Sequence, residues 1–210
     1  MSTYKVKEIY YTLQGEGAQS GRPAIFLRFT GCNLWSGREE DRNDAICTFC
    51  DTEFVGMDGP LGGKYTADEL ASQLDSLWPV GQDYRYVVCT GGEPMLQIDA
   101  ELIEAFHAKN FEIGVETNGT IVPPNGLDWI CVSPKANTDV VLRKGNELKL
   151  VVRQDGLEPE QVAEWDFQHF YLQPMDGPLV KVHTAWAIEY CLAHPKWNLS
   201  TQTHKWLGIQ

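Results

Sequence analysis

Three cysteines, Cys32, Cys47 and Cys50, combine a residue type and a spacing that suit a metal centre. Fourteen residues separate the first two, and two residues separate the last two. Thiolates are soft ligands for zinc or for the iron of an iron–sulfur cluster. Half a zinc site, a redox dithiol and unrelated thiols are also open from these residues alone. Three thiolates are one short of a closed tetrahedral site, which suggests a centre with an open position.

The long segment between Cys32 and Cys47 does not exclude a shared site. Closing a loop of 14 residues rather than three costs about 1.4 kcal/mol more, which is small beside the roughly 10 to 16 kcal/mol that a structural metal supplies. Ser36 to Glu39 has the spacing of a capping box, and Arg38 to Asp44 could follow as a short helix. We therefore expect a helical insertion at about residues 33–46 and interpret residues 36–46 as a surface helix.

A second motif is the apolar run from Tyr86 that leads into Gly91-Gly92-Glu93-Pro94. Two glycines let the backbone approach a ligand closely, and the Glu93 carboxylate could receive an ammonium group. By itself this motif could be a simple turn.

These motifs together resemble the radical S-adenosylmethionine (SAM) enzymes, whose cysteine loop carries an aromatic residue just before the last cysteine, as Phe49 does here. Further segments are similar to the 7-carboxy-7-deazaguanine synthase family within that superfamily. They are Leu13-Gln14-Gly15-Glu16-Gly17, Cys50-Asp51-Thr52, Glu116-Thr117-Asn118-Gly119, Ser133-Pro134-Lys135 and Gln173-Pro174-Met175-Asp176. The resemblance covers about residues 6–210, and the long first gap between cysteines occurs in a subgroup of that family.

The resemblance implies a lyase that converts 6-carboxy-5,6,7,8-tetrahydropterin to 7-carboxy-7-deazaguanine, a precursor of queuosine and other 7-deazapurines. The ring contracts and ammonia leaves. A [4Fe–4S] cluster, SAM and Mg²⁺ are the implied cofactors, and the radical arises on the cofactor, so no catalytic residue is assigned. A flavodoxin or ferredoxin would donate the electron, and the family forms homodimers.

The resemblance also implies a role for individual residues. Cys32, Cys47 and Cys50 would hold the cluster, and Thr52 would bind magnesium, a role that rests on the resemblance alone. The expected SAM-binding residues are Phe49, Cys50, Asp51, Gly92, Glu93, Glu116, Ser133, Pro134 and Lys135. The expected substrate-binding residues are Leu13, Gln14, Gly15, Arg28, Thr90, Gln173, Pro174, Met175, Asp176, His204 and Gln210.

Arg28 and the carboxyl-terminal residues of the expected substrate site leave an alternative open. Arg28 lies in an otherwise apolar strand, where its planar guanidinium suits a carboxylate, but an alternating strand also has a solvent face. The segment from Thr203 to Lys205 and the terminal carboxylate of Gln210 could close over the substrate or could be a solvated tail.

The elements that must position these residues alternate between strands and helices. Strands are expected near 24–30, 85–89, 111–116, 128–132, 147–153 and 168–172. Helices are expected from a capping box at Thr66 to about Trp78, from Asp99 to about Lys109, and over 181–194. Such alternation predicts a parallel sheet with its ligand-facing loops at the carboxyl ends of the strands. A full eight-unit barrel needs about 250 residues, so we expect an α/β fold with a partial (β6/α3-like) TIM-type barrel.

Composition limits the remaining choices. The chain has 210 residues, 43% of them hydrophobic, which fits one domain over residues 1–210. No apolar run is long enough to span a membrane and no signal-peptide core is evident, so a cytoplasmic protein is expected. A net charge of −12 without a basic run argues against nucleic acid as a partner. Two other readings stay open: a radical SAM activase that acts on a protein partner, and a non-enzymatic zinc-binding module.

Overall fold

The protein, described here from a computed structural model of residues 2–210, is built around one nine-stranded sheet with the order β3-β1-β2-β4-β5-β6-β7-β8-β9. The strands are β1 (Tyr4–Leu13), β2 (Pro23–Phe29), β3 (Gly63–Tyr65), β4 (Tyr86–Gly91), β5 (Glu112–Thr117), β6 (Trp129–Val132), β7 (Lys144–Val152), β8 (Asp166–Pro174) and β9 (Trp197–Leu199). Helices α1 (Ala67–Leu77), α2 (Ala100–His107), α3 (Pro159–Val162), α4 (Val180–Ala193) and α5 (Thr203–Leu207) join them, with short 3₁₀ helices at Gly17–Gln19, Glu39–Asp44 and Pro94–Leu96.

All six expected strands are present, as β2 and β4 to β8, and consecutive pairs from β2 to β9 run parallel. Strand β1 pairs antiparallel with both β2 and β3. The sheet begins at β3 and ends at β9 without closing, so the expected α/β partial barrel is confirmed. Strands β1, β3 and β9 extend it beyond the six predicted units. That residues 1–210 form one domain stays a prediction.

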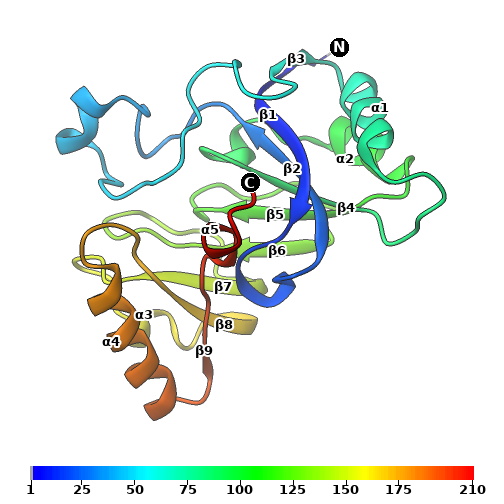
Figure 1. Cartoon of the computed structure of the whole chain (residues 1–210). Coiled ribbons are helices and arrows are strands. Elements are labelled where there is room, and N and C mark those ends of the chain that lie inside the picture. Colours follow the sequence, from blue (N-terminus) through cyan, green and yellow to red (C-terminus); the bar gives the residue numbers. More distant parts are fainter. Residues whose placement is uncertain (1) are drawn as a thin grey trace.

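The convex face of the sheet is apolar and covered by helices. Figure 1 shows α1 and α2 outside one end of the curved sheet and α3 and α4 outside the other. Beneath α1 and α2, one core gathers Ile25, Leu27, Val87, Cys89, Ile113 and Val115 from β2, β4 and β5. A second core under α4 gathers Leu148, Leu150, Phe170 and Leu172 from β7 and β8.

Helices α1 and α2 begin at the capping residues that the sequence predicted. Thr66 accepts from the Glu69 amide and the Glu69 side chain accepts from the Thr66 amide, which is the predicted capping box of α1. Asp99 caps α2 by accepting from the Leu102 amide. The capping box expected at Ser36 is wrong: its hydroxyl instead accepts from the Arg38 amide and donates to Asp41.

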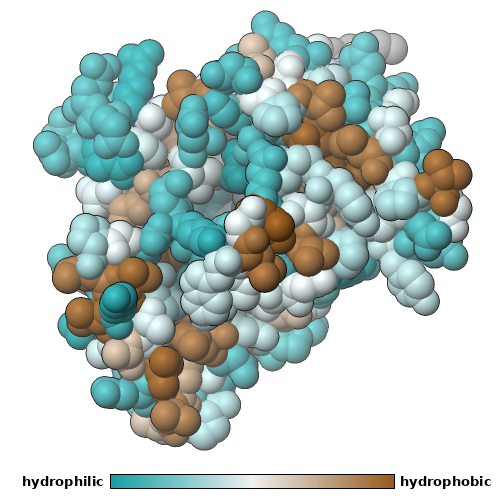
Figure 2. Space-filling view, viewed as in Figure 1, coloured by the Kyte–Doolittle hydropathy of each residue, from teal (hydrophilic) through white to brown (hydrophobic). Residues whose placement is uncertain are grey.

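The insertion between Cys32 and Cys47 is therefore helical only over Glu39–Asp44, as a 3₁₀ helix that begins after Arg38 without a side-chain cap. A hydroxyl that bonds close by in a turn competes with capping, which explains the later start. In Figure 1 the insertion projects beside the barrel, and Figure 2 shows that the surface over it is strongly hydrophilic.

The concave face of the sheet carries polar side chains. Because side chains alternate along a strand, the positions between the apolar ones point inward. Arg28 on β2 is directly beside Thr90 on β4 in the parallel register. Glu116 on β5 and Lys149 on β7 also lie on this face, since their neighbours Val115, Leu148 and Leu150 belong to the outer cores. The concave face is thus the side on which a polar ligand can be held.

Candidate active site

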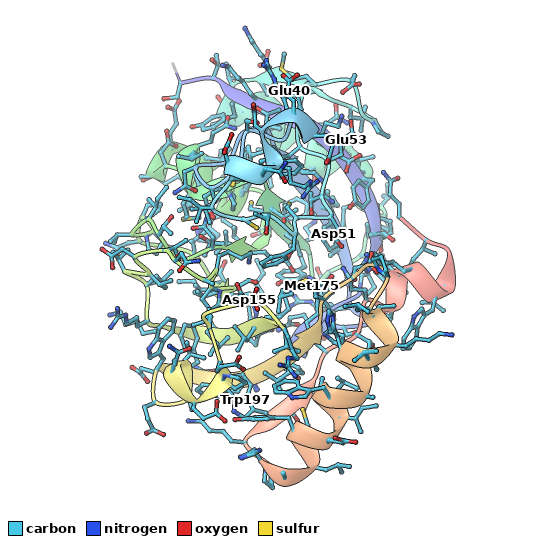
Figure 3. All side chains as sticks on the ribbon, turned by 90° about the vertical axis from the view of Figure 1, so that its left-hand side faces the viewer. Glu40, Asp51, Glu53, Asp155, Met175 and Trp197 are labelled. Atoms are coloured by element: carbon cyan, nitrogen blue, oxygen red, sulfur yellow. The ribbon has the colours of Figure 1, made fainter. Side chains whose placement is uncertain are left out.

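A cavity of about 400 Å³ opens on the concave face near the carboxyl ends of the strands. All but two of the predicted site residues line it: Leu13, Gln14, Gly15, Arg28, Cys32, Cys47, Phe49, Cys50, Asp51, Thr52, Thr90, Gly92, Glu116, Ser133, Lys135, Gln173, Pro174, Met175, Asp176, His204 and Gln210. Figure 3 shows Asp51, which follows Cys50, close to Met175, which follows β8, with both below Glu40 of the insertion.

The three predicted cysteines are free thiols on the wall of this one cavity. Burial raises the pKa of the Cys32 and Cys47 thiols, and the Lys135 ammonium opposes that rise at Cys47. Within residues 2–210, no group of three or more His, Cys, Asp or Glu side chains is placed to hold a single metal ion. A four-iron cluster is wider than one ion, and each cysteine binds a different iron, so three separated thiols around one cavity fit a cluster better than zinc.

The Gly-Gly-Glu-Pro segment brings two strand ends together beside Cys32. A Cβ on Gly92 would overlap the carbonyl oxygen of Gly31 and lie 3.0 Å from the Cys32 Cβ. The Glu93 amide also donates to the Gly31 carbonyl at 2.8 Å. Only a glycine permits this approach, which holds the end of β4 against the first cysteine.

The Glu93 carboxylate, which was predicted to bind SAM, makes three hydrogen bonds within the protein. It does not line the cavity and has no exposed surface. It accepts from the Thr117 hydroxyl at 2.7 Å and from the amides of Asn118 and Met95 at 2.8 and 3.0 Å. The side chain therefore ties the end of β4 to the end of β5, and its burial keeps it from an ammonium group in the cavity.

Pro134 is the other predicted residue that does not line the cavity. Its carbonyl accepts from the Gln154 side chain at 3.1 Å, which anchors the Ser133 to Lys135 turn from behind. In front, the Lys135 ammonium donates to the carbonyl and hydroxyl of Ser133 at 2.6 and 2.8 Å. Burial lowers the pKa of Lys135, while the nearby Cys47 and Cys50 oppose that change.

Arg28 faces the cavity rather than solvent, which decides between the two readings of its strand. Its side chain is 17% exposed and pairs with Glu8 at 2.8 Å. The Arg28 Nη2 also donates to the Tyr10 hydroxyl at 3.1 Å. The Glu8 pair uses Nε, so other guanidinium donors are available to a carboxylate in the cavity.

The sequence did not predict a buried cluster of charged side chains on the concave face. The Lys149 ammonium lies 2.6 Å from a Glu16 oxygen and 3.1 Å from a Glu116 oxygen, and its side chain is 5% exposed. Burial alone would lower the pKa of Lys149, but the two carboxylates raise it well above its usual value. The alternation of charged and apolar residues from Glu147 to Leu150 was the signal that could have identified it.

The carboxyl-terminal segment lies on the cavity, and its closing over a substrate stays a prediction. The amide and hydroxyl of Thr203 both donate to the Gly15 carbonyl, at 3.0 and 2.8 Å. The Lys205 ammonium bridges Asp51 at 2.8 Å and Asp176 at 2.6 Å. Thr12 donates to the backbone carbonyl oxygen of Gln210 at 2.8 Å. The segment therefore joins β1, the cysteine loop and the loop after β8.

Comparison with known proteins identifies a family, two relatives and a solved structure that are similar to this chain. Residues 42–149 match the Radical SAM superfamily. The chain is 62% identical to the 7-carboxy-7-deazaguanine synthase of Bradyrhizobium diazoefficiens, over 99% of this chain and 100% of that protein. It is 61% identical to the protein of the same name from Caulobacter vibrioides, over 99% of each. The crystal structure of QueE from Escherichia coli superimposes with a TM-score of 0.73 at 28% identity, over 95% of this chain and 94% of that one.

Proposed function

The chain belongs to the 7-carboxy-7-deazaguanine synthase family of the Radical SAM superfamily, and from this premise we propose that it converts 6-carboxy-5,6,7,8-tetrahydropterin to 7-carboxy-7-deazaguanine with release of ammonia. One observation carries the proposal: the three cysteines and the polar residues suited to a pterin line the same cavity. The family favours this reaction over an activase or a zinc-binding module.

The cysteine side of the cavity would hold the cluster and the SAM. Cys32, Cys47 and Cys50 would bind three irons of a [4Fe–4S] cluster, which together with SAM supplies a radical able to remove a hydrogen atom from the substrate. Phe49 and Asp51 line the cavity beside the last cysteine and are suited to the adenosine. Gly92 approaches the Gly31 carbonyl closely. The backbone at Gly92, rather than the Glu93 carboxylate, would therefore bind the methionine end of SAM.

The opposite side of the cavity would bind the pterin. Arg28 would receive the substrate carboxylate through its free guanidinium donors. The aminopyrimidine ring of a pterin presents N–H donors, which match the carboxylates of Glu16 and Glu116 beside the Lys149 ammonium. Glu116 would then serve the pterin and not SAM, to which the sequence assigned it. Gln14, Thr90, His204 and the residues from Gln173 to Asp176 would complete the wall, and the carboxyl-terminal segment would limit the access of water.

Magnesium and the interaction partners complete the proposal. Thr52 lines the cavity between Asp51 and Glu53, which gives a hard cation an oxygen-rich surrounding.

A flavodoxin or ferredoxin would supply the electron in the cytoplasm. The apolar side chains of Val182, Ile188 and Leu192, exposed along α4, support assembly as a homodimer. Of the described residues, no helix is long and apolar enough to cross a membrane.

Anaerobic reconstitution tests the proposal directly. The loaded protein should contain four irons and four sulfides per chain, a stoichiometry that follows from the cluster type. With SAM, a reductant, magnesium and 6-carboxy-5,6,7,8-tetrahydropterin, mass spectrometry should detect 7-carboxy-7-deazaguanine and an equal amount of ammonia. A protein that binds only zinc, or a fully loaded enzyme that makes no deazapurine, would contradict the proposal. Omitting magnesium should lower the rate if Thr52 serves that ion.

A further inference from the structure

Arg42 belongs to the insertion between Cys32 and Cys47. Its side chain contacts the segment from Cys47 to Cys50, which carries the last two cysteines. The Arg42 Nη1 donates to the carbonyl oxygen of Thr48 at 2.9 Å and to that of Cys50 at 3.2 Å. Residues 47–50 belong to no helix or strand. A side-chain donor is therefore what holds these two carbonyls in place, and one of them belongs to a predicted cluster ligand.

Arg42 is itself held rigidly on its other sides. Its Nε donates to one oxygen of Glu39 at 2.7 Å, and its Nη2 donates to the other oxygen. The guanidinium also lies 4.0 Å from the centre of the Trp35 ring, and Trp35 is buried. A planar fork with fixed donors can serve a carboxylate, an aromatic face and two carbonyls at once, whereas a lysine ammonium cannot. The interpretation of residues 36–46 as a surface helix therefore does not hold for Arg42.

We propose that Arg42 is a positioning residue that fixes the backbone at Cys50 so that the loop of 14 residues can replace a short turn between cluster ligands. The inference rests on the proposed cluster at Cys32, Cys47 and Cys50. Fixing the carbonyl of Cys50 fixes the direction of its thiolate and of the adjacent Phe49. Groups that orient metal ligands in this way typically change metal affinity or activity by about 10-fold to 100-fold when removed.

The charge of Arg42 adds an effect that a purely structural residue would lack. A cation near two cluster thiolates stabilises the more negative, reduced state of the cluster. Removal of this charge should therefore lower the reduction potential, while lysine at the same position should retain the charge but not the fork.

The test compares wild type, Arg42→Gln and Arg42→Lys after anaerobic reconstitution. We expect iron release to a chelator to be about 10-fold faster in Arg42→Gln, with a lower reduction potential and an altered electron paramagnetic resonance signal when SAM is bound. Arg42→Lys should also release iron faster, because the fork is lost, but should keep a potential close to that of wild type. It also provides a milder change should Arg42→Gln fail to fold.

Arg38→Gln is the matched control. Arg38 lies in the same insertion with 69% of its side chain exposed, and among residues 2–210 its side chain pairs only with Glu40, at 3.7 Å. We expect it to match wild type in iron release, potential and spectrum. Wild-type iron release in both Arg42 variants would overturn the inference, as would faster release with an unchanged potential and spectrum in Arg42→Gln. A wild-type protein that loads no cluster would instead overturn the proposed function.

Discussion

At the scale of single residues, the concave face is governed by the compensation of buried charge. Lys149 lies between Glu16 and Glu116, and Arg28 lies against Glu8. A buried charge is costly without a partner, so each of these groups constrains the position of the next. The carboxylates can then present fixed acceptors to a ligand because the lysine behind them also stays in place.

Replacing Lys149 with methionine should therefore affect both stability and substrate binding. Loss of the ammonium leaves Glu16 and Glu116 facing each other, and breaking a buried pair costs about 3 to 5 kcal/mol. We expect a lower midpoint of urea unfolding and a KM for the pterin raised at least about 10-fold, with kcat less affected. Lys149→Arg keeps the charge and should recover part of both losses. Equal KM values in Lys149→Met and wild type would contradict this role.

Glu147 predicts a pH dependence of stability. It is 3% exposed, accepts from the Ala18 amide at 3.1 Å, and has a pKa that burial raises, although Lys149 opposes the rise. A carboxyl group whose pKa is higher in the folded state binds more protons there. Its stabilising contribution is complete below the unfolded pKa of about 4.3 and is lost as the pH rises through the folded pKa.

Glu147→Gln removes this titration while keeping the size of the side chain. The free energy of unfolding of wild type minus that of the variant should fall with rising pH above about 4.3, by at most about 1.4 kcal/mol per pH unit. Urea unfolding of both proteins from about pH 5 to about pH 8 measures the difference. Parallel stability curves over that range would show that the ionisation of Glu147 does not change on folding.

At the scale of elements, the sequence predicted what local periodicity controls. The strands β2 and β4 to β8, and the caps of α1 and α2 at Thr66 and Asp99, follow from apolar runs and from side chains that bond within three residues. Strand β1 was missed because its lysine, glutamate and tyrosine residues obscure the alternation and its register shifts between Val6 and Glu8. Local pattern also could not distinguish a capping box at Ser36 from a hydroxyl bonded in a turn.

The sequence predicted which residues gather at the cavity better than it predicted the contacts that each side chain makes. A motif at the end of a parallel strand must lie near the other strand ends, which is why so many predicted residues line the cavity. Which way a side chain bonds depends on contacts that are distant in sequence. Glu93 illustrates this limit, because its partners Thr117 and Asn118 are 24 and 25 residues away.

The junction between β2 and β4 supports a prediction at this scale. A Cβ on Gly92 would overlap the Gly31 carbonyl, so Gly92→Ala must separate the end of β4 from Cys32. We expect iron affinity after reconstitution to fall about 10-fold. Gly81→Asn is the control, because Gly81 lies in a turn with nothing within 4 Å of a Cβ and asparagine tolerates its positive φ. Normal iron loading in Gly92→Ala would show that the close approach is not needed.

At the scale of the whole molecule, the carboxyl-terminal segment meets the end of the first strand at the cavity. Figure 1 shows the carboxyl-terminal segment crossing the concave side of the sheet near β1. The segment contacts β1 through Thr12 and Gly15 and contacts the cysteine loop through the ion pair of Lys205 with Asp51. Segments that are distant in sequence therefore enclose the region between the proposed cluster and the proposed pterin site.

The closing contacts of Lys205 lead to the last prediction. Its ammonium joins Asp51, beside the proposed cluster, to Asp176, beside the proposed pterin, so Lys205→Met should loosen the enclosure without removing a cluster ligand. We expect a KM for the pterin about 10-fold higher, the equivalent of about 1.4 kcal/mol in binding, with unchanged iron content. Trp206→Ala is the matched control, because Trp206 lies on the same helix and is 75% exposed. If both variants raise the KM equally, the effect belongs to the folding of α5 and not to the bridge that Lys205 makes across the cavity.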